Sequence, residues 1–225
     1  MSFKFLRTTL GSDPNMGLYG FATDKYCIIG AEPNKHVLTK MRDTLGVPIH
    51  LSHIAETELA GIFMAGNSNG ILLTKISEKY EIAKLKKMLD INFAIVKSRE
   101  TAIGNIVLCN DKGCLVSPLL KRYKKSIADC LGVEVDIGTM AGLDVVGSAA
   151  VTSNTGCLCH RAAKEEELKK VEQLLKVKTD VGTVGFGSPF IKSSLIVNSK
   201  GVIIAETSTG PELGRIDEVF GDRNE

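Results

Sequence analysis

The stretch GNIVLCNDKGCLVSP, residues 104–118, decides the fold, because its strand, four-residue turn and second strand recur along the chain. The turn signal at its centre, Asn110-Asp-Lys-Gly113, has counterparts at residues 23–26, 67–70, 153–156 and 198–201. The last positions of successive turns are 44, 43, 43 and 45 residues apart. Self-similarity at such a period is the signature of repeat architectures. The sequence therefore predicts five copies of one unit.

The residues of the turn fit a tight hairpin. Asn or Ser at the first position caps the following amides, and Gly at the fourth position is expected to take the left-handed conformation of a bulged hairpin. Tyr26 holds the fourth position of the first turn. A tyrosine is strained in a left-handed conformation, so we expect this turn to differ in detail from the others.

Each turn is flanked by two apolar strands. The residue nine positions before the end of the turn marks the start of the first strand. It is Gly17, Gly61, Gly104 or Gly147 in the first four copies and Lys192 in the last. First strands are predicted over 61–67, 104–110, 147–153 and 193–199. Second strands are predicted over 27–31, 71–75, 114–118, 157–161 and 202–206. The pattern indicates a β-hairpin in every copy.

A charged segment with one apolar stripe follows each hairpin. Apolar residues four positions apart mark the buried side of a helix. These pairs are Met41/Leu45, Leu85/Leu89, Ile127/Leu131, Val171/Leu175 and Ile216/Phe220. A third strand is predicted after the helix in four copies, over 47–52, 91–97, 133–138 and 177–182.

The fifth copy stops before a third strand, whereas residues 2–8 form a strand that precedes the first hairpin. If this strand completes the last copy, the units close into a ring, and no atypical capping repeat is needed. We therefore predict an α/β fold, a five-fold pseudosymmetric β/α propeller closed by the N-terminal strand. We expect a single domain over residues 1–225, with repeats at about 15–53, 54–98, 99–139, 140–183 and 184–221.

Composition narrows the class of protein. Hydrophobic residues make up 44% of the chain and charged residues 24%, close to the soluble globular average. A formal net charge of +2 is too weak to supply non-specific affinity for nucleic acid. The sequence has no apolar run of membrane-spanning length and no signal-peptide pattern, so we expect a cytoplasmic protein. The spacing of its six cysteines favours reduced, buried thiols.

Three short motifs invite a chemical interpretation, and each has a structural explanation. Cys157-Leu-Cys159-His160 lacks the second ligand pair of a zinc site, and the position of Cys157 is small and apolar in every copy. The glycine-rich segment 182–188 matches no phosphate-binding motif and is expected to be a tight turn between copies. The basic segment 121–125 opens a helix, which favours a solvated outer face over contact with RNA. No metal, cofactor or small-molecule substrate is predicted.

Several segments together resemble the translation initiation factor 6 family, the ribosome anti-association factors of archaea and eukaryotes. The resemblance runs along nearly the whole chain and keeps the order and spacing of every segment. The segments are Ala65-Gly-Asn67, Ala102-Ile-Gly-Asn105-Ile, Cys109-Asn-Asp, Leu131-Gly-Val-Glu-Val135, Val146-Gly-Ser148, Ser153-Asn154 followed by Gly156, and Val181-Gly-Thr-Val184.

The resemblance implies the pentein fold and an activity without chemistry. A member of this family is expected to bind the large ribosomal subunit near ribosomal protein uL14 and the sarcin-ricin loop. It is expected to act as a monomer and to block joining of the small subunit by occupying that surface. The expected contact residues lie in inter-blade and hairpin loops on one face, and they are Asn67, Asn105, Asn110 and Asn154.

The chain departs from the family's eukaryotic members in two places, and two alternatives stay open, of which one, a small-molecule binder that uses the polar mouth of the channel, is favoured by nothing in the sequence. Those members carry a basic residue where this chain has Ile62, a position within the expected binding patch, and they carry a C-terminal tail whose absence here indicates an archaeal type. The other alternative is a guanidine-modifying pentein, a deiminase or amidinotransferase, which uses a late nucleophilic Cys, a His and carboxylates in the central channel. Because the last cysteine is Cys159 and the fifth copy has neither Cys nor His, a protein that is not an enzyme is favoured.

Overall fold

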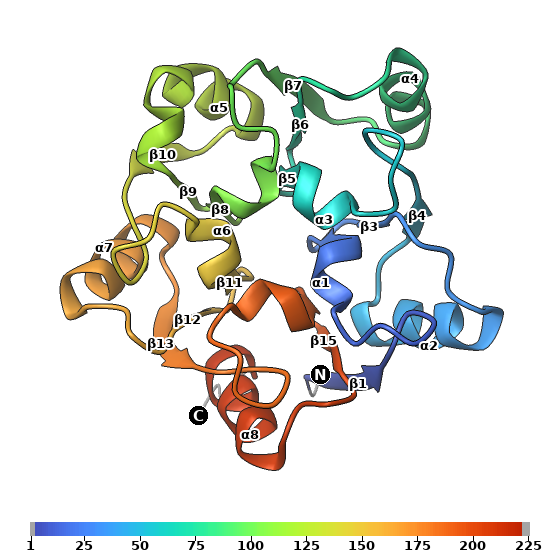
Figure 1. Cartoon of the computed structure of the whole chain (residues 1–225), viewed down its shortest axis with the longest axis vertical. Coiled ribbons are helices and arrows are strands. Elements are labelled where there is room, and N and C mark those ends of the chain that lie inside the picture. The colour runs from blue at the N-terminus through green and yellow to red at the C-terminus, as the bar shows by residue number, and fades with distance from the viewer. Residues whose placement is uncertain (1–2, 222–225) are drawn as a thin grey trace.

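Five small sheets surround a central axis in the computed structural model, which describes residues 3–221 (Figure 1). Each sheet has three strands, in the orders β2-β3-β4, β5-β6-β7, β8-β9-β10, β11-β12-β13 and β14-β15-β1. In every sheet the first two strands are antiparallel and the third is parallel to the middle one. This arrangement confirms the predicted α/β fold with five-fold pseudosymmetry, of the pentein type.

The strands occupy three concentric positions. Those next to the axis are β2 (Gly20–Ala22), β5 (Met64–Gly66), β8 (Val107–Cys109), β11 (Ala150–Thr152) and β14 (Leu195–Val197). The middle strands are β3 (Cys27–Ile29), β6 (Gly70–Thr74), β9 (Gly113–Val116), β12 (Gly156–His160) and β15 (Gly201–Ala205). The outer strands are β4 (Ile49–Leu51), β7 (Asn92–Val96), β10 (Glu134–Ile137), β13 (Lys178–Gly182) and β1 (Lys4–Thr8).

The strand β1 closes the ring. It pairs in parallel with β15, with Lys4 opposite Gly201 and Thr8 opposite Ala205. The predicted closure of the last unit by the N-terminal strand is therefore confirmed, although Ser2 of the predicted strand 2–8 lies outside the described residues. Pairing along the whole of β15 covers an edge that would otherwise present free backbone groups.

Long helices surround the sheets. They are α2 (Lys35–Leu45), α4 (Lys79–Met88), α5 (Lys124–Leu131), α7 (Glu165–Leu175) and α8 (Gly210–Phe220), and the 3₁₀ helix η2 (Pro118–Tyr123) precedes α5. Each long helix buries its apolar stripe between two neighbouring sheets, because α5, for example, packs against β6, β7 and β10. No helix within residues 3–221 combines the length and the apolarity needed to cross a bilayer.

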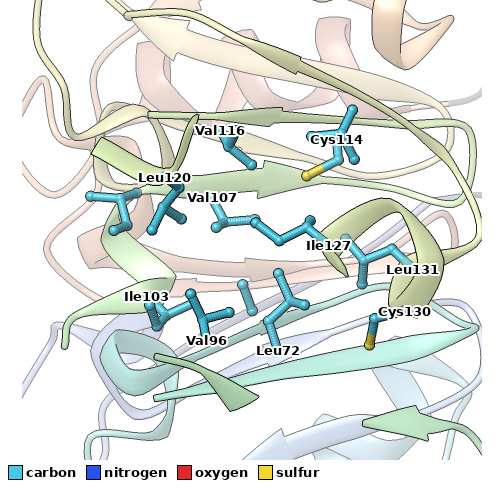
Figure 2. Packing of buried hydrophobic residues seen from close by; sticks show 13 residues of the cluster. Leu72, Val96, Ile103, Val107, Cys114, Val116, Leu120, Ile127, Cys130 and Leu131 are labelled. Carbon is cyan, nitrogen blue, oxygen red and sulfur yellow. The ribbon is translucent and has the colours of Figure 1, made fainter. Parts of the chain in front are cut away.

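The hydrophobic core is divided among the junctions between sheets. At the junction in Figure 2, Leu72 and Val96 of one sheet face Val107 and Val116 of the next, and Ile127 of α5 covers them. Four further clusters of the same kind fill the other junctions. Each copy of the repeat therefore depends on its neighbours for a buried core.

Short helical turns replace the first half of the predicted axis strands. They are α1 (Met16–Tyr19), α3 (Ala60–Phe63), η1 (Ile103–Asn105), α6 (Val146–Ala149) and η3 (Ile191–Ser194). The predicted strands over 61–67, 104–110, 147–153 and 193–199 therefore begin too early. The cause is close packing around the axis, where a Cβ on Gly61 would lie 2.1 Å from the carbonyl oxygen of Gly17, and one on Gly104 would lie 2.0 Å from that of Gly61.

The glycines that end the hairpin turns correct a second expectation. These glycines are Gly70, Gly113, Gly156 and Gly201, and none of them has a left-handed backbone. They are needed because the next long helix packs against them: a Cβ on Gly113 would lie 2.1 Å from the carbonyl oxygen of Leu174. Tyr26 is therefore unstrained, and its turn closes like the others, with the Thr23 amide donating to the Tyr26 carbonyl at 2.8 Å. The expected strain is absent, but the first turn does differ in detail, because the Tyr26 hydroxyl donates to the Asn67 carbonyl of the next copy at 2.7 Å.

Candidate functional site

A narrow channel runs along the axis between the five inner strands. Its wider hollow, of about 70 Å³, is lined by those strands and by Lys192. A second hollow of about 20 Å³ lies at the hairpin turns. These volumes suffice for a few water molecules, whereas pockets for small organic ligands measure roughly 300 Å³ or more. The channel therefore runs from one face of the ring to the other and is too small for such a ligand.

Asn67, which opens a hairpin turn, is a structural residue that is only 1% exposed. Its Nδ2 donates to the carbonyl oxygens of Asn110, at 3.1 Å, and Leu131, at 2.9 Å. Its Oδ1 accepts from the amides of Asn69 and Gly70 at 3.0 and 3.1 Å. The carboxamide thus closes its own turn, ties it to the next copy, and has all its hydrogen-bonding positions filled.

Asn110 repeats this arrangement one copy further along. Its Nδ2 donates to the carbonyl oxygens of Ser153 and Leu175, both at 3.0 Å. Asn198 makes the corresponding bonds from the last copy to the first. Asn67 and Asn110 were both predicted to contact the partner, but their carboxamides are hydrogen-bonded within the protein.

Asn154, the third predicted contact residue at the hairpin turns, belongs to a ring of polar side chains. Its Nδ2 donates to carboxylate oxygens of Asp24 and Asp111, both at 2.7 Å. Asp24 also accepts from the amide and the hydroxyl of Ser199. Asp111 accepts in the same way from Ser68. Asn154 is half-buried, and its amide hydrogens serve to bridge two carboxylates.

Asn105 lies at the opposite end of the channel. It ends η1 immediately before the strand β8, whereas Asn110 follows that strand. Its side chain is half-buried and makes no hydrogen bond with any residue of the described part of the chain. The four predicted residues therefore do not share one face, and Asn105 alone keeps its carboxamide available on the face formed by the short helices.

The loops on this short-helix face are fixed by three glutamates that the sequence analysis missed; Glu81 and Glu212 are buried and Glu167 is half-buried. Glu212 accepts from the amides of Thr209, at 2.7 Å, Gly187, at 2.8 Å, and Phe186, at 3.2 Å. Glu81 and Glu167 fix the corresponding loops in the same way. Each stands three residues after the N-cap of a long helix, and for Glu212 the capping-box pattern that begins at Thr209 was a signal available in the sequence.

Hydrogen bonding sets the protonation of two of these glutamates. Desolvation acts to raise the pKa of Glu212, but the amide donors of Thr209, Gly187 and Phe186 outweigh it and hold the pKa below its usual value. The same opposition, with a net lowering of the pKa, holds for Glu167. Both carboxylates are therefore charged in the folded protein at neutral pH, as the amide donors require.

Phe186 projects from the loop that Glu212 fixes, and it is 81% exposed. It has a left-handed backbone, with φ of 68°, between Gly185 at 55° and Gly187 at 96°. A left-handed conformation is strained for a bulky residue, and such strain persists only where the surroundings enforce it. Phe190, 41% exposed, follows on the same segment. The fixed backbone of the loop thus presents a large apolar side chain to solvent, as an interface anchor requires.

Lys192 takes the place that glycine holds in the other copies. Its Nζ donates to the carbonyl oxygen of Gly104 at 2.7 Å, across the axis. Burial lowers the pKa of this amine to about 8. The side chain therefore lies across the axis and lines the wider hollow.

The cysteine motif proves to be part of the core. Cys157 and Cys159 are fully buried, with their Sγ atoms 3.7 Å apart. The position of Cys157 is occupied by a buried apolar residue in every copy, as predicted. These residues are Cys27, Ile71, Cys114, Cys157 and Val202. Across residues 3–221 there is no cluster of three or more His, Cys, Asp or Glu side chains arranged to hold a metal ion.

Comparison with known proteins finds similarity to one family along almost the whole chain. The eIF-6 family model matches residues 5–219. Translation initiation factor 6 of Methanocaldococcus jannaschii is 36% identical over 222 residues, covering 96% of this chain and 97% of that protein. The protein of the same name from Pyrococcus abyssi is 38% identical over 221 residues, with coverage of 96% and 97%. The one from Sulfolobus acidocaldarius is 40% identical over 215 residues, with coverage of 94% and 96%.

Proposed function

The chain belongs to the eIF-6 family, and from this membership we propose that it is a translation initiation factor that binds the large ribosomal subunit and sterically prevents premature joining of the small subunit. The match over residues 5–219 carries the proposal. Relatives named translation initiation factor 6 support it over nearly the full length of the chain. The factor acts in the cytoplasm as a monomer, near protein uL14 and the sarcin-ricin loop, in initiation and in ribosome biogenesis.

The face formed by the short helices and the glutamate-fixed loops is the proposed contact surface. Three observations support this choice over the hairpin-turn face. The Asn105 carboxamide is uncommitted, and the aromatic ring of Phe186 stands in solvent on a fixed loop. Asn67 and Asn110 at the other face have no hydrogen-bonding capacity left for a partner. Ile62, where eukaryotic members are expected to be basic, is half-buried in α3 on the proposed face.

The proposed activity is steric, and the channel supports this reading. A guanidine-modifying enzyme needs a thiolate, a base and carboxylates around a bound substrate. The wider hollow, about 70 Å³ in volume, is lined by Cys109 and Lys192 but by no carboxylate or histidine of the described residues. Relatives of the chain are named as initiation factors. We therefore propose that the protein is not an enzyme, and expect no citrulline to form from free arginine.

Sedimentation tests the proposal directly. The full chain is mixed with purified large subunits, small subunits are added, and the mixture is resolved on a sucrose gradient. We expect the chain to travel with the large subunit and the peak of associated ribosomes to shrink. A chain that stays at the top of the gradient with large subunits alone would show that the proposal is wrong.

A further inference from the structure

Two cysteines face each other across the hairpin β8–β9. Cys109 and Cys114 are partners in the antiparallel register. The neighbouring pair is hydrogen-bonded, with the Asn110 amide donating to the Gly113 carbonyl at 3.1 Å. Because the two kinds of pair alternate, Cys109 and Cys114 occupy a non-hydrogen-bonded site, where Cα atoms lie about 4.5 Å apart and both side chains point to one face. This separation is within the range of about 4.4–6.8 Å that a disulfide spans.

The two thiols differ in their access to solutes. Cys109 is partly exposed and lines both hollows of the axial channel. Cys114 is fully buried among the apolar residues shown in Figure 2. Burial, together with a hydrogen bond to Cys109, raises the pKa of the Cys114 thiol well above its usual value. A small solute in the channel therefore meets Cys109 first.

We propose that Cys109 and Cys114 form a thiol modification site, a pair that hydrogen peroxide converts into a reversible disulfide within the hairpin. Peroxide is small enough for a hollow of about 70 Å³. The Cys109 sulfur attacks one peroxide oxygen, the O–O bond breaks, and the departing hydroxide takes up the thiol proton and leaves as water. The Cys114 sulfur then attacks the Cys109 sulfenic acid, the S–O bond breaks, and a second water leaves. Two thiols are oxidised and one peroxide is reduced.

The remaining cysteines supply internal controls. Cys157 and Cys159 are close, but they stand two residues apart on one strand, where Cα atoms are about 6.6 Å apart, near the limit for a disulfide. Neither lines a hollow of the channel. Cys130 lies on α5 and donates to the carbonyl oxygen of Ile71 at 3.5 Å. Only the third copy has cysteine at both hairpin positions, since Ala22 faces Cys27 and Thr152 faces Cys157.

Peptide mapping tests the proposal on the full chain. The folded, reduced protein is treated with hydrogen peroxide, its free thiols are alkylated in denaturant, and it is digested with trypsin. Cleavage after Lys112 separates the two cysteines, so a disulfide links peptides 100–112 and 113–121. We expect this linked pair, lighter by two hydrogens than its separate peptides and released by dithiothreitol. Oxidation of Cys109 to a sulfinic acid with Cys114 still alkylated overturns the proposal.

Substitutions taken from other copies keep the test interpretable. Cys109→Ala installs the residue that the first copy has at this position, Ala22, and Cys114→Val installs the one that the fifth copy has, Val202. Both variants are expected to fold and to form no link, and in Cys109→Ala the Cys114 thiol stays reduced. Cys130→Ala is the matched control and forms the link like the parent chain. Peroxide-driven loss of the Cys114 thiol in Cys109→Ala, or equal linkage of Cys157 and Cys159, contradicts the assignment.

Discussion

The carboxamide of Asn198 donates a 3.0 Å hydrogen bond to the backbone carbonyl of Thr23, and so joins the last sheet to the first. A second bond, of 2.9 Å, runs to the carbonyl of Leu45 at the end of α2. Asn67 and Asn110 make the same two bonds between other copies. At these three junctions, one asparagine side chain thus fixes both a turn and a helix end of the neighbouring copy.

Replacing Asn198 with Ala is expected to lower the free energy of unfolding by about 2–4 kcal/mol. The carbonyls of Thr23 and Leu45 lose their donor in a buried place, and each unsatisfied group costs roughly 1–3 kcal/mol. Urea denaturation measures the change. The control is Lys200→Ala in the same turn, since Lys200 is exposed and its removal is expected to cost less than about 0.5 kcal/mol. Equal effects of the two substitutions would contradict the structural role of Asn198.

Asn105→Ala and Asn67→Ala are expected to have opposite effects. Asn105 carries a free carboxamide on the proposed contact face, so its loss weakens binding to the large subunit by about tenfold, or 1.4 kcal/mol, with an unchanged melting temperature. Asn67 is buried and internally bonded, so its loss lowers the melting temperature and leaves the affinity of the folded protein unchanged. Gradient titrations and thermal melts measure both. A reversed pattern would move the contact surface to the hairpin-turn face.

Phe186→Gly is expected to stabilise the fold while weakening binding. Glycine accepts the φ of 68° without strain, which adds up to about 1 kcal/mol to the free energy of unfolding. The lost side chain is 81% exposed, so little burial is given up. Phe186→Ala separates the two effects, because it removes the ring but keeps the strain: it weakens binding equally without a gain in stability. Unimpaired binding by both variants would exclude Phe186 as an anchor.

Stability is expected to fall on acidification through the glutamates that fix the loops. The folded-state pKa of Glu212 lies below its ordinary value of 4.5. Its contribution is therefore fully present above pH 4.5 and is lost as the pH falls through the folded-state pKa. Glu212→Gln is expected to flatten this part of the urea midpoint profile, since an amide has no charge to lose. Glu166→Gln, an exposed change on α7, is expected to leave the profile unaltered. If Glu212→Gln does not reduce the dependence of the urea midpoint on pH, the charged Glu212 carboxylate does not stabilise the loop.

The local pattern of the sequence was enough to predict the repeat, the hairpins and the closure by residues 4–8. It was not enough for the axis, because Gly61 and Gly104 lie in short helical turns that pack against a carbonyl of the preceding copy, a contact remote in sequence. The fixing of loops by Glu81, Glu167 and Glu212 was missed for a similar reason. The capping box at Thr209 and Glu212 is visible in the sequence, but the loop amides that share the carboxylate come from the preceding segment.

The structural role of Asn67 and Asn110 could have been predicted from the sequence. Asparagine recurs at the first turn position in three copies, with Asn198 as the third. A partner that meets one face has no reason to select the same residue around a pseudo-five-fold axis, whereas a junction between copies does. Recurrence therefore points to architecture, and Asn105, whose counterpart in the next copy is Ser148, is the kind of position where a binding role is expected.

The pairing of β1 with β15 also sets an order of events during synthesis. The four complete sheets from β2 to β13 draw all their strands from one continuous segment each, so each is complete soon after its residues are made. The last sheet joins Lys4 to Gly201, with every other blade between them in the sequence. Closing so long a loop is slow compared with forming local contacts. We therefore expect the nascent protein to be an open arc, with its first strand unpaired until the last hairpin has been made, and the ring to close as the final step of folding.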